Sequence, residues 1–356
     1  MNNQSLFTKK DAVCLKGLAI LLIAFHNFFH LLPPNYACNE FRFIYTAGRF
    51  AFSSLNFSNS IIVLFSFLGY VGIYVFFFLS GYGLTKQTNI HKSDYCYSIK
   101  RIWKLWKLLL LGVVWYIIIN IGHVDYLVLL RKLTMTDNFS IFRVSTVSMP
   151  WWFLCCLAQL YLIFIPLYKF IHKKQSNIFI ILYLYVMIAY LWQESAFSGK
   201  YIKYMYWNFI GHLPEFCLGI FLAEYENKLT YLRKKSILWN LFIFGLLLFL
   251  LAQFSKWVWV FNGVATILFL LSLYKIIGEK MLNKLSYLGM ISPYFYIIHG
   301  FTFRYFFVQL AKYDSPLYQI LWALVWFLIV SLIASLFYVI NNRLAHRHCK
   351  AKQEKS

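Results

Sequence analysis

Long apolar runs recur along the whole chain and are separated by short polar segments. A helix needs about 20 apolar residues to cross the roughly 30 Å hydrocarbon core of a bilayer. Hydrophobic residues make up 61% of the chain and charged residues only 13%, whereas soluble domains carry about 25% charged residues. We therefore predict an all-α integral membrane protein without an appended soluble domain. Its bundle of about ten transmembrane helices is centred on residues 12–32, 61–85, 105–121, 151–170, 177–193, 204–223, 236–253, 257–275, 286–307 and 318–341.

The basic residues are distributed unevenly between the predicted loops. An even number of spans puts both termini on one side, and assigning that side to the cytoplasm places most of the 34 Lys and Arg residues there. Membrane proteins carry such an excess in their cytoplasmic loops. The net charge of +22 therefore reflects membrane orientation rather than nucleic-acid binding. We predict a multi-pass protein of the cell membrane, with a transmembrane domain over residues 1–345 and a basic cytoplasmic tail over 346–356.

The cysteines and aromatic residues give weaker signals. The seven Cys residues show neither disulfide nor metal-ligand spacing, so we expect no metal site. The aromatic residues on the predicted outer side can stack on sugar rings or form a belt at the membrane interface, and we favour the belt. These aromatic residues are Trp151, Trp152, Tyr201, Tyr204, Tyr206 and Trp207.

Ionisable side chains within the predicted spans are candidates for function, because a bilayer makes them costly. Each histidine also has a structural interpretation as a hydrogen-bond partner between helices. The candidates are His26 and His30 on one face of the first helix, His212 and Glu215 on one face of the sixth, and His299 on the ninth. His212 and Glu215 can also simply pair with each other.

The depth of His26 follows from its distance along the helix. Lys16 is expected near the cytoplasmic interface, and His26 follows ten residues later. At 1.5 Å per residue, His26 then lies about 15 Å deeper, near the bilayer midplane. His212 and His299 fall near the middle or outer half of their own spans. Three predicted helices therefore present a histidine at a similar depth.

Five blocks along the chain, in order, resemble the acyltransferase-3 family of membrane acyltransferases. The first resembles the family's first helix, the second its phenylalanine run followed by Leu-Ser-Gly, and the others three later regions. The blocks are Leu15–Asn27, Phe76–Leu84, Trp151–Phe153 with Tyr161–Pro166, His212–Phe216 with Leu218 and Gly219, and Ser292 with Tyr296–His299. The first block departs from the family pattern, because Lys16 stands where members generally carry Arg, one residue closer to the His.

The resemblance implies transfer of an acyl group, usually acetyl, from cytoplasmic acyl-CoA to a hydroxyl. The acceptor is typically a cell-surface polysaccharide or its lipid-linked precursor. The partners implied are therefore acyl-CoA, a glycan or lipid-linked glycan, and membrane lipids, with no permanently bound cofactor and no nucleic acid.

Acyl transfer to an alcohol needs a base for the hydroxyl proton and donors for the oxyanion of the intermediate. His26 near the midplane suits the base. Asn27, Ser80, Tyr82 and His299 remain alternatives for the oxyanion donor or for the group that orients His26.

The phosphates of CoA suit the basic segment before the third span. Lys100, Arg101 and Lys104 share a helix face and, with Lys16, can form a phosphate-binding mouth. The alternative is ordinary cytoplasmic charge. Ser80 and Gly81 lie where a small residue permits close approach of the ligand.

Two other classes of function compete with acyl transfer. A transporter or flippase for a glycan or lipid-linked precursor also places polar residues at the midplane. A membrane scaffold is the third class. Acetyl transfer from labelled acetyl-CoA to an endogenous glycan distinguishes the enzyme from both.

Overall fold

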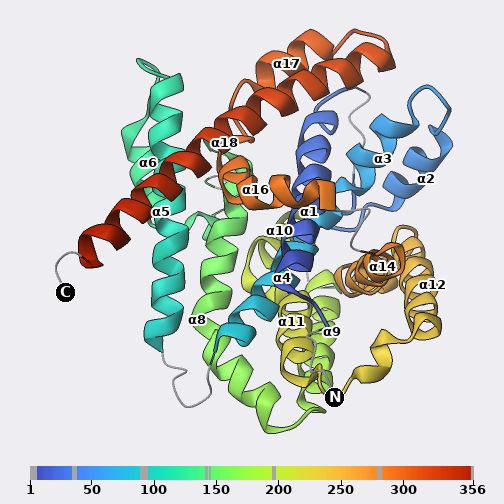
Figure 1. The fold of residues 1–356 in the computed structure, drawn as a ribbon. Helices are drawn as coiled ribbons and strands as arrows, with labels where there is room; N and C mark the ends of the chain where they lie inside the picture. The colour runs from blue at the N-terminus through green and yellow to red at the C-terminus, as the bar shows by residue number, and fades with distance from the viewer. Residues whose placement is uncertain are drawn as a thin grey trace.

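The computed structural model describes residues 6–33, 38–88, 95–140, 143, 146–194, 198–278 and 283–353. Every regular element within these ranges is helical, and the helices form one bundle (Figure 1). The all-α prediction is therefore confirmed.

The first half of the bundle comprises α1 (Lys9–Phe29), α2 (Tyr45–Ser53), α3 (Ser60–Leu68), the 3-10 turn η1 (Gly69–Val71), α4 (Gly72–Gln87), α5 (Tyr95–Ile119), α6 (Tyr126–Leu133) and α8 (Trp152–Lys173). The second half comprises α9 (Asn177–Glu194), α10 (Ser198–Trp207), η5 (Phe209–His212), α11 (Leu213–Tyr225), α12 (Lys235–Ala252), α13 (Lys256–Trp259), α14 (Asn262–Ile277), α16 (Ser286–Ile298), α17 (Arg304–Ala311) and α18 (Pro316–Gln353).

Seven helical segments in the described ranges are long and apolar enough to cross a bilayer. They are Lys9–Phe29, Ser60–Gln87, Tyr95–Ile119, Met149–Lys173, Asn177–Glu194, Lys235–Ala252 and Pro316–Leu344. The other three predicted spans correspond to the shorter helices α11, α14 and α16. The chain is thus a multi-pass membrane protein, and the count of ten spans stays a prediction.

One predicted boundary differs from the structure. The span expected over 286–307 ends at Ile298, and a separate helix begins at Arg304 after Phe303 adopts a left-handed φ of 52°. The sequence does not reveal this break clearly, because residues 299–303 include two Phe and neither Lys, Arg, Asp nor Glu. The expected tail from residue 346 is helical through Gln353, where it continues α18, and its boundary stays a prediction.

Helix α1 is the central element of the bundle. It packs against α16, α3, η1 and α4, and Figure 1 shows α1 inside the ring formed by the other helices. Thr8 and Asp11 form a reciprocal capping box at its start, which satisfies two backbone N–H groups that a helix terminus otherwise leaves unpaired. An apolar helix with a capped start thus presents His26 to the protein interior rather than to lipid.

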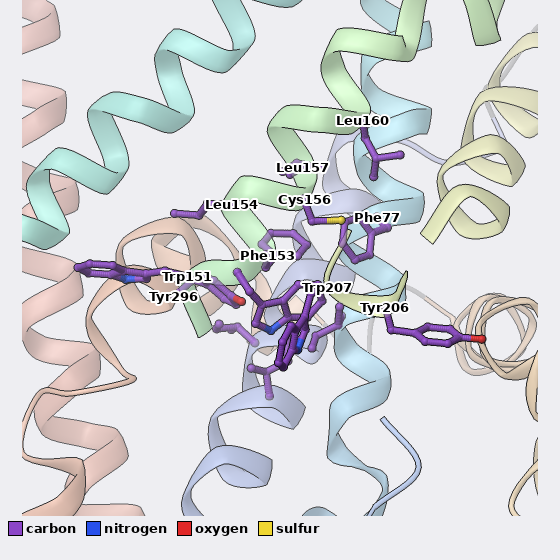
Figure 2. Close-up of a cluster of buried hydrophobic side chains, with 14 of the residues drawn as sticks. Phe77, Trp151, Phe153, Leu154, Cys156, Leu157, Leu160, Tyr206, Trp207 and Tyr296 are labelled. Atoms are coloured by element: carbon purple, nitrogen blue, oxygen red, sulfur yellow. The ribbon is translucent and has the colours of Figure 1, made fainter. Parts of the chain in front are cut away.

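An aromatic core surrounds the N-terminal end of α8. Figure 2 shows Phe153 and Tyr296 beside one another and Trp207 nearby, with Leu154, Leu157 and Leu160 following α8 away from them. The expectation of an interfacial belt is wrong for four of the aromatic residues, because their side chains are buried in the protein. These four are Trp151, Trp152, Tyr206 and Trp207.

A buried carboxylate ties the N-terminal residues to the inner ends of two helices. Glu226, directly after α11, accepts hydrogen bonds from the Tyr82 hydroxyl at 2.7 Å and from the Leu6 backbone N–H at 3.2 Å. Lys86 forms an ion pair with the same carboxylate. Burial raises the pKa of Glu226, but the hydrogen bonds from Lys86 and Tyr82 outweigh it and hold the pKa below its usual value of 4.5.

Replacing Glu226 with Gln should lower the free energy of unfolding by about 1–3 kcal/mol at pH 7, since buried donors lose a charged acceptor. Because the folded-state pKa is lowered, the stabilisation is fully present above pH 4.5 and is lost as the pH falls through the folded-state value. Thermal unfolding in nanodiscs at several pH values measures the difference. Glu224→Gln is the control, because Glu224 pairs with the exposed His172. If the destabilisation caused by Glu226→Gln is as large at low pH as at pH 7, the ionised Glu226 carboxylate is not the stabilising group.

The backbones of α4 and α11 come so close together that the position of Gly81 has no room for a side chain. A Cβ atom added to Gly81 would lie 2.1 Å from the Phe216 carbonyl oxygen, whereas one added to Gly83 meets nothing within 4 Å. The place of Gly81 in the sequence is therefore explained by helix packing, independently of any ligand.

Gly81→Ala is expected to destabilise the protein by about 1–3 kcal/mol, because two backbones must move apart. Gly83→Ala, two residues away on the same helix, should be neutral or slightly stabilising, since Ala favours helix. Thermal unfolding of both variants in the same nanodiscs makes the comparison. Equal effects at the two positions would refute the packing explanation.

Candidate active site

A cavity of about 390 Å³ lies beside the C-terminal half of α1. Two sides come from α1 and from the loop that follows it, and the rest from the starts of α4 and α8 and from α10 and α16. The polar residues that line the cavity are His26, Asn27, His30, Cys38, Glu40, Arg42, Lys203 and Tyr296. The structure thus brings His26, His30 and Asn27 into one site.

The ring of His26 is held in one orientation. Its Nδ1 lies 3.2 Å from the Phe65 carbonyl oxygen, and a carbonyl only accepts, so Nδ1 carries the proton. Nε2 faces the cavity and lies 3.7 Å from Glu40 Oε2. Gly69 makes this orientation possible, because a Cβ there would lie 2.7 Å from the His26 Cβ. The His26 side chain is 3% exposed.

Asn39 anchors the loop that faces His26. Its side chain accepts from the Ile44 N–H at 2.8 Å and donates to the Gln253 carbonyl at 3.3 Å. Its carbonyl accepts from the Trp259 indole N–H at 2.7 Å. Asn39 is completely buried, and these bonds fix the backbone between Cys38 and Glu40.

His299 is joined to Asn27 but does not line the cavity. Its Nδ1 donates to the Tyr296 carbonyl at 2.7 Å, which leaves Nε2 to accept from the Asn27 amide at 3.1 Å. The Tyr296 hydroxyl in turn donates to the Pro150 carbonyl at 2.6 Å. Both ring nitrogens of His299 thus take part in hydrogen bonds. His299 affects the cavity only indirectly, by orienting the Asn27 side chain.

His212 and Glu215 form a neighbouring buried pair. His212 Nε2 donates to the Tyr206 carbonyl at 2.9 Å, and Nδ1 lies 3.9 Å from Glu215 Oε2. The ring stacks on Phe77 and Trp152, with centroids 4.2 Å and 5.5 Å away. The two side chains lie side by side, but the facing atoms Nδ1 and Oε2 form no hydrogen bond, so their pairing stays a prediction. Through Trp152 the His212 ring supports one wall of the cavity.

The predicted basic group lies at the other end of α1. Lys16 and Arg101 are close enough for their charges to repel. Arg101 is held by a hydrogen bond to the Tyr97 hydroxyl at 3.2 Å and by a second to Gln87. Lys100 and Lys104 lie on the same helix and are exposed. Lys16 of α1 and Arg101 of α5 therefore form a cationic patch, and its role in binding CoA stays a prediction.

Ser80 and Tyr82 lie toward this inner end of α4. The Ser80 hydroxyl donates to the Phe76 carbonyl at 2.8 Å, and Tyr82 belongs to the Glu226 network. Neither lines the cavity of His26.

An aromatic layer lies between the patch and the cavity. Phe76, one turn outward from Ser80 on α4, has its ring centroid 5.9 Å from Phe153 and 6.3 Å from Tyr296. Tyr296 lines the cavity. The site therefore has a cavity with His26 on one side of these packed rings and the cationic patch of Lys16 and Arg101 on the other.

Sequence reasoning missed Cys38 and Glu40. Both lie in the loop after α1, beyond the predicted first span, and neither has regular spacing from His26. Their proximity to His26 depends on how Asn39 folds the loop back.

Comparison with known proteins identifies the family. The family model of the acyltransferase-3 domain, described as an acyltransferase domain, matches residues 13–340. Among curated proteins and among solved structures there is no significant match. Because the family match extends over nearly the whole chain, the protein belongs to the acyltransferase-3 family of membrane acyltransferases.

Proposed function

We propose that this membrane acyltransferase moves an acetyl group from cytoplasmic acyl-CoA to a hydroxyl of a cell-surface polysaccharide or its lipid-linked precursor, with His26 as the general base. The observation that carries the proposal is the orientation of His26. Its Nδ1 is engaged by the Phe65 carbonyl, so its basic nitrogen Nε2 is directed to the cavity. A base of this kind must reach the acceptor hydroxyl directly.

The reaction balances with this one base. His26 Nε2 takes the hydroxyl proton as the acceptor oxygen attacks the thioester carbonyl. The tetrahedral intermediate collapses, the carbon–sulfur bond breaks, and the imidazolium returns its proton to the CoA thiolate. The thioester is already activated, so a covalent enzyme intermediate is not needed.

Two neighbours support the charges that develop. Glu40, 3.7 Å from Nε2, stabilises the imidazolium once the proton has moved. Asn27 lines the cavity and uses one amide hydrogen on His299, which leaves its second hydrogen for the oxyanion. In this scheme Asn27 is catalytic, and His299 is a positioning residue that acts through Asn27.

The donor enters from the opposite side. Lys16 and Arg101 suit the phosphates of CoA, and Lys16 lies about 15 Å along α1 from His26. An extended pantetheine arm covers that distance. Its thioester has to pass the rings of Phe76, Phe153 and Tyr296, so donor binding in this scheme displaces at least one of them.

The outer rim of the cavity favours an anionic acceptor. Arg42 and Lys203 line the cavity together with His26. Guanidinium and ammonium groups bind carboxylates and phosphates. Acidic sugars and pyrophosphate-linked glycans carry these groups. Placing both termini in the cytoplasm puts this rim on the outer side of the cell membrane, where such acceptors are found.

His26→Gln should lower acetyl transfer by about 10²–10⁴-fold, because the hydroxyl loses its base. The measurement is transfer of labelled acetyl from acetyl-CoA to glycan by purified protein in nanodiscs. His172→Gln is the matched control, since His172 lies at the end of α8 and pairs with Glu224. A His26 variant that folds and keeps most of its activity would refute the proposal. Glycan flipping without acetylation would favour the transporter.

Neutralising Lys16 or Arg101 to Gln should raise KM for acetyl-CoA by about tenfold or more, the equivalent of one lost charge-assisted hydrogen bond. The turnover rate at saturating donor should change less. Lys173→Gln removes an exposed charge at the inner end of α8 and should leave KM unaltered. If all three variants change KM equally, the effect is general surface charge and the donor site is elsewhere.

A further inference from the structure

Three ligand-type side chains meet at the cavity. One donor atom each from His26, His30 and Cys38 lies within 4.8 Å of the other two. The two imidazole rings are nearly parallel, with centroids 5.2 Å apart. His26 is buried and the other two are partly exposed. The cluster is therefore accessible from the cavity.

The set of donors matches Zn²⁺. Zinc takes imidazole nitrogen, thiolate sulfur and carboxylate oxygen in a tetrahedral arrangement. From bond lengths of about 2.0–2.3 Å, two donors on one zinc lie about 3.3–3.8 Å apart. Donors within 4.8 Å thus reach this spacing by side-chain shifts of about 1 Å. Glu40 Oε2 lies 3.7 Å from His26 Nε2, beside the cluster, and is the candidate for the fourth ligand.

The surroundings of His26 complete the metal site. Zinc-binding histidines usually donate their second ring N–H to a carbonyl or carboxylate, which fixes the tautomer. His26 already does this through Nδ1 and the Phe65 carbonyl. Arg42 and Lys203 line the same cavity and oppose a cation, but the Cys38 thiolate and the Glu40 carboxylate together balance the charge of Zn²⁺.

We propose that His26, His30 and Cys38, with Glu40, bind one Zn²⁺ ion in this cavity. Binding forms bonds from the ion to its ligand atoms in place of bonds to water, and Cys38 loses its thiol proton to solvent. Since His26 has only Nε2 available, the metal and the acceptor hydroxyl compete for the same atom. Zinc is therefore an inhibitor of acyl transfer; this consequence rests on the proposed role of His26, whereas metal binding does not.

Metal binding is tested first, without any assay of activity. The full chain in nanodiscs is stripped with a chelator and titrated with Zn²⁺ against a chromophoric competitor. One site per chain is expected, with affinity reduced at least tenfold in Cys38→Ser and in His30→Gln. Cys96→Ser is the matched control, because Cys96 is an exposed thiol outside the cluster, and it should bind zinc as the wild type does.

Cobalt provides an independent signature. Co²⁺ bound in the site should show a thiolate-to-metal charge-transfer band that Cys38→Ser lacks and Cys96→Ser retains. Equal zinc affinity in wild type and Cys38→Ser, or a cobalt spectrum without that band, overturns the site. Thermal unfolding of the metal-free variants establishes that each has folded.

The inhibitory role is tested next, on the same samples. Each protein's rate with Zn²⁺ is compared with its own metal-free rate. In the wild type and in Cys96→Ser, the rate of acetyl transfer should fall at least tenfold at zinc saturation. In Cys38→Ser, the same inhibition should require a zinc concentration at least tenfold higher. If the chelator rather than zinc abolishes transfer, the metal is not an inhibitor, although the site itself stands. If zinc binds but transfer is unaffected, His26 is not the base.

Discussion

The contact between α1 and the η1 segment is the constraint on which the site depends. At Gly69 the two backbones come so close that a single added carbon would lie 2.7 Å from the His26 Cβ. That approach brings the Phe65 carbonyl within 3.2 Å of Nδ1. One hydrogen bond thereby fixes the ring orientation of His26 and directs Nε2 to the cavity. A shift of either helix would leave a buried polar group without its partner, which costs about 1–3 kcal/mol.

The buried polar residues hold different segments of the chain in place at the two ends of the bundle. At the end that carries the N-terminus of α1, Glu226 and its partners hold the N-terminal segment to the helices. At the opposite end, Asn39 holds the loop that carries Cys38 and Glu40. Each group is satisfied within the protein, as an apolar environment requires. Anchors of this kind leave the donors at the cavity available for chemistry.

The proposed proton abstraction and the proposed metal binding depend on the same property of His26. A neutral imidazole with one nitrogen held by a carbonyl offers a single lone pair. Whichever group reaches Nε2 first excludes the other. The inner cationic patch and the outer cavity lie on either side of the aromatic rings of Phe76, Phe153 and Tyr296. Donor and acceptor therefore approach the same histidine from opposite faces of the membrane in the proposed reaction.

The sequence by itself determined the helical membrane class, the family, and the histidines that share a face of α1, because hydrophobic length and helical periodicity are local properties. Only the tertiary structure decided which polar residues meet. His299 accepts a hydrogen bond from Asn27. Gly81 is needed where α4 packs against α11. Cys38 lies beside His26 because the loop after α1 folds back. Loop paths and helix contacts depend on many distant side chains at once, so no spacing along the chain encodes them.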